Sequence, residues 1–111
     1  MYTKIKGGTQ MVDKLGDLPY SYQEDIKKAT RILKENGATE VFIFGSIANG
    51  KFNKNSDIDI AVKGLNQKNF YKVASILMFE LENEFDLIDL DEKENRFSQM
   101  LLKVGGLLRV G

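Results

Sequence analysis

Two aspartates separated by one residue, Asp57 and Asp59, are the pair in this sequence best placed to do chemistry. The segment around them alternates polar and apolar residues, as a half-buried β-strand does. Successive strand residues point to opposite faces, so both carboxylates lie on one face, roughly 7 Å apart at the backbone. An isolated Asp-x-Asp is more often the solvated face of an amphipathic strand. Two like charges on one strand repel, however, and one or two divalent cations would remove that conflict.

A third aspartate, Asp86, occurs in the otherwise apolar segment from Phe85 to Leu90. A carboxylate in an apolar strand requires a partner. Asp86 lies in the first half of its strand, as Asp57 does in its own, so neighbouring strands would bring the three carboxylates together. Asp89 points to the opposite face, and we interpret it as a strand-end or helix-cap residue.

Gly45 and Ser46 directly follow a buried apolar segment. Glycine lets the backbone turn sharply and lets a phosphate approach the main chain, and serine can direct its hydroxyl and nearby amides at an anion. Gly-Ser after a strand is commonly only a turn, so this pair gains weight only beside the acids. Lys51, in the polar loop that follows, is a candidate phosphate contact, although a lysine in such a loop is more often a solvated charge.

The inventory of side chains narrows the chemistry further. The 111 residues include no histidine and no cysteine. This excludes Ser-His-Asp and Cys-His catalysis, histidine and thiolate metal sites, and disulfides. Carboxylates, hydroxyls and backbone amides remain, and they suit a hard cation such as Mg²⁺. Sixteen basic and sixteen acidic residues give zero net charge, which argues against a large nonspecific nucleic-acid footprint.

The elements that must position these residues follow from hydrophobic periodicity and turn signals. Ser21 and Glu24 form a capping box for the first helix, and Gly37 fits the left-handed position that ends it. Residues Leu107 to Val110 form a terminal strand or a docked tail. We expect helices at Ser21–Asn36, Asn66–Asn83 and Phe97–Val104, a helical turn at 47–49, and strands at Glu40–Phe44, Asp57–Val62 and Phe85–Leu90.

This order predicts one α/β (α+β) domain over residues 1–111, with a small mixed β-sheet and helices packed mainly on one face. Residues 1–20 are expected to be weakly ordered or to form a short helix that contains Met11, Val12, Leu15 and Leu18. No apolar run approaches the roughly 20 residues that a membrane span needs. The first eight residues lack the apolar core of a signal peptide, so we expect a cytoplasmic protein.

Taken together, the candidate residues resemble a known signature. Gly45 and Ser46, ten intervening residues, and then Asp57 and Asp59 are similar to the Gly-Ser-x(10)-Asp-x-Asp pattern of minimal nucleotidyltransferases, within the DNA polymerase β-like superfamily. The stretch Val41–Val62 resembles the core of that family without insertion or deletion. The resemblance implies the nucleotidyltransferase fold.

The segment Phe85 to Ile88 resembles the later strand that carries the third carboxylate of the family. The resemblance implies Mg²⁺-dependent transfer of a nucleoside monophosphate, AMP from ATP, to a hydroxyl. Asp57 and Asp59 would hold the metal. Asp86 would complete a second metal site and position or deprotonate the acceptor.

The resemblance implies that Gly45 and Ser46 hold the terminal phosphates. Lys51 is a further candidate for that contact. Many relatives carry arginine at two positions of this loop, where the present chain has Ile47 and Asn49.

Stand-alone chains of this size resemble the antitoxin partners of HEPN ribonucleases, which place AMP on a tyrosine of the toxin. The intact acids favour such an enzyme. The missing arginines favour an alternative, a catalytically weak nucleotide-binding module that blocks a HEPN ribonuclease sterically. A structural domain that binds no nucleotide is a third interpretation. The acceptor, the base preference and the oligomeric state stay open.

Overall fold

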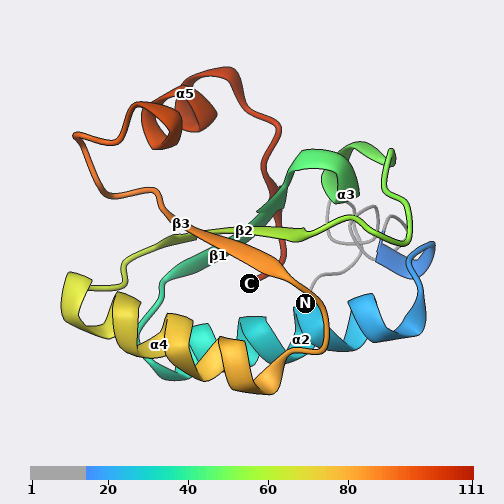
Figure 1. Cartoon of the computed structure of the whole chain (residues 1–111). Helices are drawn as coiled ribbons and strands as arrows, with labels where there is room; N and C mark the ends of the chain where they lie inside the picture. The colour runs from blue at the N-terminus through green and yellow to red at the C-terminus, as the bar shows by residue number, and fades with distance from the viewer. Residues whose placement is uncertain (1–14) are drawn as a thin grey trace.

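The computed structural model describes residues 15–111, in which two long helices and two shorter ones pack around a four-stranded sheet (Figure 1). The elements in chain order are α2 (Tyr20–Glu35), β1 (Glu40–Phe44), α3 (Gly45–Asn49), β2 (Ile58–Lys63), α4 (Gln67–Glu80), β3 (Phe85–Asp89), α5 (Arg96–Val104) and β4 (Leu108–Arg109).

The sheet is mixed, as the sequence predicted. Its strand order is β3-β2-β1-β4. Strand β1 pairs antiparallel with both β2 and β4, whereas β2 and β3 are parallel. Parallel neighbours need a crossover connection, and α4 provides it between β2 and β3. Residues Leu107 to Val110 were expected to form a terminal strand or a docked tail. The pairing of Leu108–Arg109 with β1 shows that this segment contains a strand.

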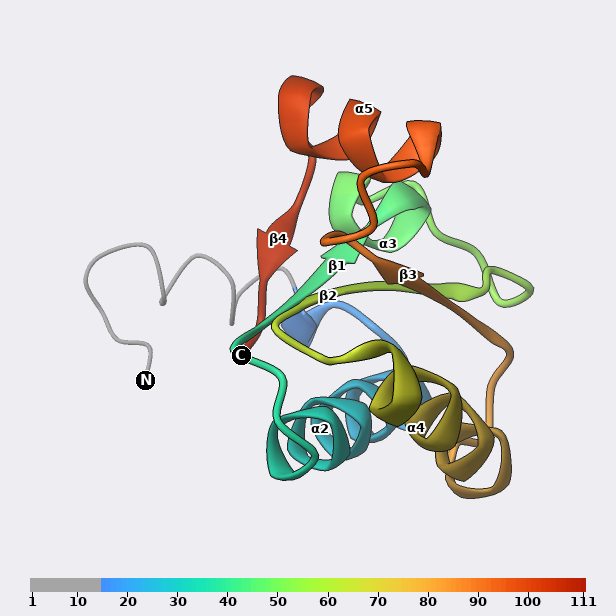
Figure 2. The ribbon, with the colours of Figure 1, turned by 90° about the vertical axis from the view of Figure 1, so that its left-hand side faces the viewer.

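Helices α2 and α4 lie side by side under one face of the sheet (Figures 1 and 2). They cover the apolar side of β2, on which Ile58, Ile60 and Val62 are fully buried. Helix α5 lies over the opposite face, where Leu101 packs in a second, smaller cluster with Phe44. The prediction that the helices pack mainly on one face is thus confirmed for the two long helices.

The predicted capping box is wrong. Helix α2 begins at Tyr20, its N-cap is Pro19, and no side chain caps it. Proline has a fixed φ near the helical value and no amide hydrogen, so the helix begins before Ser21, which is already helical. The Ser21 hydroxyl instead accepts a hydrogen bond from the side-chain amide of Asn83 at 3.3 Å.

Helix α4 differs from the prediction both in the residue at which it ends and in the face that it buries. Helix α4 ends at Glu80, three residues early, because Leu81 is already extended with φ −87° and ψ 146°. Met78 falls at helical spacing in the apolar stripe of this segment, which the sequence indicates as its packed face, yet it is 74% exposed. The expected N-terminal helix falls largely on residues 1–14, outside the described range. None of the helices within residues 15–111 is both long and apolar enough to cross a membrane.

Candidate functional site

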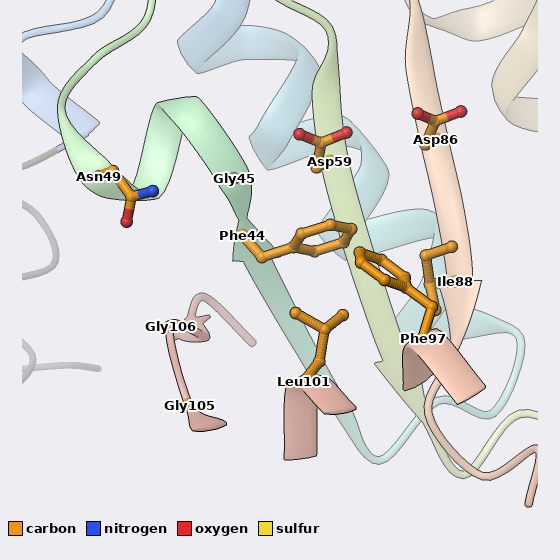
Figure 3. A pocket seen from close by; sticks show the side chains of 10 residues that line it. All are labelled: Phe44, Gly45, Asn49, Asp59, Asp86, Ile88, Phe97, Leu101, Gly105 and Gly106. Carbon is orange, nitrogen blue, oxygen red and sulfur yellow. The ribbon is translucent and has the colours of Figure 1, made fainter. Parts of the chain in front are cut away.

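Asp59 and Asp86 are brought side by side by the parallel pairing of β2 with β3. The register aligns the two residues directly, so their side chains leave the same face of the sheet (Figure 3). Asp59 is half-buried and Asp86 is exposed. The two carboxyl groups are close enough for the charge of Asp86 to act on Asp59. The structure therefore joins two of the three acids that the sequence singled out.

Gly45 lies directly against the Asp59 carboxylate. The antiparallel register places Phe44, the last residue of β1, opposite Asp59. Gly45 follows with φ +74°, and a Cβ atom at this position would collide with the Asp59 carboxylate. Only glycine tolerates both the left-handed backbone and the close approach. Ser46 comes next, in the first turn of α3.

Asp57 lies one residue before β2 and is exposed. Its segment is held by Tyr22 of α2, whose buried hydroxyl donates to the carbonyl oxygens of Ser56 at 2.6 Å and Lys54 at 3.2 Å. Asp57 lines a neighbouring hollow, not the cavity shared by Asp59 and Asp86. Within residues 15–111 no three acidic side chains converge as a preformed metal cage.

Burial is the main cause that raises the pKa of Asp59 from 3.8 to about 6. The negative charges of Asp86 and Asp57 raise it further. Burial and the neighbouring negative charges disfavour the ionised form of Asp59. The site therefore binds a proton or a cation more readily than two solvent-exposed carboxylates would. The donors are all carboxylate oxygens, which fits Mg²⁺.

Asp59 and Asp86 line a cavity of about 460 Å³, which is within the size range of pockets that bind small ligands. Asn49, Asp59 and Asp86 form its polar end. No lysine or arginine lines it in the described part of the chain. Its remaining lining residues are Phe44, Gly45, Ile88, Phe97, Leu101, Gly105 and Gly106 (Figure 3).

The apolar end of this cavity was not predicted from the sequence. The rings of Phe44 and Phe97 stand 5.8 Å apart at 59° and form one wall. Phe97 and Leu101 are four residues apart, a helical spacing that puts both on one apolar face and is the usual signal of core packing. It carried no signal that this helix lies over the acids.

The two positions at which many relatives carry arginine, and the candidate phosphate contact Lys51, lie in different surroundings. Ile47 is only 4% exposed and packs in the main core, away from the cavity. Asn49, the other position where relatives carry arginine, lines the cavity. Lys51 is exposed and does not line it, although its backbone amide donates to the carbonyl oxygen of Ser46 at 2.9 Å.

Asp25 is a positioning residue that was not predicted from the sequence. It is 2% exposed, and its carboxylate accepts hydrogen bonds from the backbone amides of Glu82 at 3.0 Å and Asn83 at 2.7 Å. The Asn83 side chain adds a third at 3.0 Å. These bonds fix the loop from which β3 begins, and hence the position of Asp86. An acid on the apolar stripe of a helix, next to Ile26, was the available signal.

Comparisons with known proteins agree with this geometry. The family model described as polymerase beta nucleotidyltransferase matches residues 27–109. No curated protein matches the chain significantly in sequence.

Several solved structures are similar. A chain in a crystal structure of a toxin-antitoxin with AMP-PNP is 27% identical, with a TM-score of 0.59 over 75% of this chain and 69% of that one. A chain of the MntA-HepT toxin-antitoxin is also 27% identical, with a TM-score of 0.54 over 78% and 70%. A minimal nucleotidyltransferase structure aligns over 99% of both chains with a TM-score of 0.56, but at 16% identity it supports the fold alone.

The family model spans most of the chain, and its match includes Gly45, Asp59 and Asp86, which the structure brings together. The chain therefore belongs to the polymerase β nucleotidyltransferase family.

Proposed function

We propose that this protein transfers AMP from Mg-ATP to a tyrosine hydroxyl of a HEPN-family toxin and thereby acts as its antitoxin. The observation that carries the proposal is the alignment of Asp59 with Asp86 at the polar end of a cavity whose other end is apolar. Such a cavity suits a molecule with a charged triphosphate and an apolar base. The aromatic wall that contains Phe97 would take the base.

Asp59 and Asp86 would hold Mg²⁺, and Asp57 would join them from the start of β2. The metal would offset negative charge on the phosphate oxygens and orient the triphosphate. The raised pKa of Asp59 supports this assignment, because the site is short of positive charge.

Each residue of the site then has a defined task in the transfer. Asp86 is exposed, so an acceptor can reach its carboxylate. The acceptor oxygen forms a bond to the α-phosphorus, the bond from that phosphorus to the bridging oxygen breaks, and pyrophosphate leaves with the electron pair. Asp86 accepts the hydroxyl proton. Gly45 and Ser46 would position the terminal phosphates, and Lys51 would approach them from solvent.

The solved relatives support both the nucleotide and the partner. One similar structure is a toxin-antitoxin with AMP-PNP, an ATP analogue, and another is the MntA-HepT toxin-antitoxin. The identity is 27% in both cases.

A second candidate function is steric neutralisation of the toxin without turnover. It is favoured by Ile47 and Asn49, and by a cavity that no lysine or arginine of residues 15–111 lines. Phosphate affinity depends strongly on such positive groups.

Titration of the toxin separates the two functions. A trace amount of this protein with Mg-ATP should inactivate a large excess of its HEPN ribonuclease partner, which should gain mass in units of AMP. Asp86→Asn should prevent the gain. Intact-mass spectrometry of the ribonuclease is the measurement. Neutralisation that needs stoichiometric protein, ignores ATP and survives Asp86→Asn would establish the steric function instead.

A further inference from the structure

A second groove, of about 560 Å³, runs between α4 and β3. Asp86 lies in the lining of this groove and also in the lining of the cavity described above. The groove therefore leads from the outer surface of α4 to the acid that would receive the acceptor proton. Its lining residues are Phe70, Tyr71, Ala74, Met78, Leu81, Glu82, Asn83, Glu84, Phe85, Asp86 and Leu87.

The α4 side of the groove is apolar and exposed. Tyr71 is 65% exposed and Met78 is 74% exposed, and Phe79 beside them is exposed as well. Large apolar side chains gathered at a hollow are typical of a surface that another molecule covers.

The β3 side of the groove is an open strand edge. The Ile58 amide donates to the Glu84 carbonyl, and the Leu90 amide donates to the Val62 carbonyl, each at 2.9 Å. Backbone groups of alternate residues face the same neighbour, so those of residues 84, 86, 88 and 90 face β2. Those of Phe85 and Leu87 face outward, and within residues 15–111 no strand pairs with that edge. An extended polypeptide can add to such an edge as a further strand.

The charges at the groove determine what kind of polypeptide fits. Its lining contains Glu82, Glu84 and Asp86 and no basic residue. A segment with lysine or arginine side chains would be attracted. A second copy of this chain that paired through the same edge would instead bring its own Glu82 and Glu84 against these acids.

We infer that the α4–β3 groove is the docking site of the acceptor polypeptide. An extended segment with apolar and basic side chains pairs with the outer edge of β3, covers Tyr71 and Met78, and presents its hydroxyl to Asp86. This inference rests on the proposed transfer to a protein hydroxyl, and adds where and how the acceptor binds.

The test uses the double variant Tyr71→Glu/Met78→Glu, because both side chains are exposed and the fold should tolerate the change. Tyr20→Glu is the matched control: Tyr20 is 75% exposed, lies on α2 and does not line the groove. The full chain and the HEPN ribonuclease are used throughout. Circular dichroism and calorimetry with Mg-ATP verify the fold and nucleotide site of each variant.

We expect the double variant to weaken ribonuclease binding and raise the KM for the ribonuclease by about tenfold or more, the range of central interface residues. Its kcat at saturating ribonuclease and its Mg-ATP affinity should be retained. Tyr20→Glu should behave as wild type. Glu82→Lys/Glu84→Lys should weaken binding most at low salt, and hydrogen exchange at the Phe85 and Leu87 amides should slow in the complex.

Failure of the inference and failure of the proposed function have different signatures. Binding that the double variant abolishes, without AMP transfer by wild type, leaves the groove as the partner site and refutes the transfer. AMP transfer that the double variant leaves unchanged refutes the groove alone. A wild-type dimer that the same variant dissociates also overturns the inference, because the occupant is then a second copy.

Discussion

Gly45 lies so close to the Asp59 carboxylate that no side chain fits between them. The contact joins the turn after β1 to the half-buried acid of β2, and the pairing of Phe44 with Asp59 enforces it. The backbone at Gly45 is also left-handed, with φ +74°. Backbone conformation and packing thus both require glycine here.

Gly45→Ala should therefore lose both stability and activity. The left-handed backbone costs alanine about 1 kcal/mol, and the collision displaces Asp59. Gly50→Ala is the matched control, since Gly50 has φ +77° and open space around its Cβ position. Urea unfolding and AMP transfer measured on both variants should show similar backbone costs, with transfer lost only in Gly45→Ala. Equal activity in the two would refute the role of the contact.

The raised pKa of Asp59, about 6 instead of 3.8, predicts how stability depends on pH. Between these values the folded chain holds more protons at Asp59 than the unfolded chain does. The contribution of Asp59 to the free energy of unfolding therefore falls as pH rises through this window, and the full penalty applies above it. Asp59→Asn should be more stable than wild type above about pH 7, and the difference should vanish near about pH 4.

Urea unfolding of wild type and Asp59→Asn across this pH range measures the effect. Subtracting the two curves removes the titrations that both proteins share. Mg²⁺ should stabilise wild type above about pH 6 and have less effect on Asp59→Asn, because the cation relieves the same repulsion. A pH-independent difference would contradict the assigned pKa.

Asp25→Ala should destabilise the fold by about 3 kcal/mol, because two partly buried backbone amides lose their acceptor. Asn83→Ala removes only one of the three hydrogen bonds to Asp25 and should cost about 1 kcal/mol. Chemical unfolding gives both values. Equal costs would mean that the backbone bonds of the loop do not depend on Asp25.

Asn49→Arg should raise the affinity for Mg-ATP several-fold, because it adds a positive group to a cavity lined by acids. Ile47→Arg should instead unfold or strongly destabilise the chain, since Ile47 is buried in the core. Calorimetric titration and thermal melting distinguish the two variants. An Asn49→Arg protein with unchanged ATP affinity would show that the side chain at this position does not reach the phosphates.

The sequence by itself determined the positions of the strands, the Asp-x-Asp pair, and the turn at Gly45 that precedes this pair. Alternation of polar and apolar residues is a local property of a strand, so the strand that carries Asp59, and the face opposite Ile58 and Ile60, could be deduced without knowing the fold. The same holds for the turn at Gly45. The helices were predictable to within a few residues, and the capping box failed because Pro19 begins α2 before Ser21.

Only the tertiary structure decided which acids meet and what surrounds them. Asp86 is 27 residues beyond Asp59 in the chain, and they become neighbours because α4 returns β3 parallel to β2 in one register. Asp57 lies outside their cavity because its segment is tied to Tyr22. The placement of α5 over the acids and the burial of Asp25 depend equally on distant packing. Strand register and packing are set by the sum of many contacts remote in sequence, and no local pattern encodes that sum.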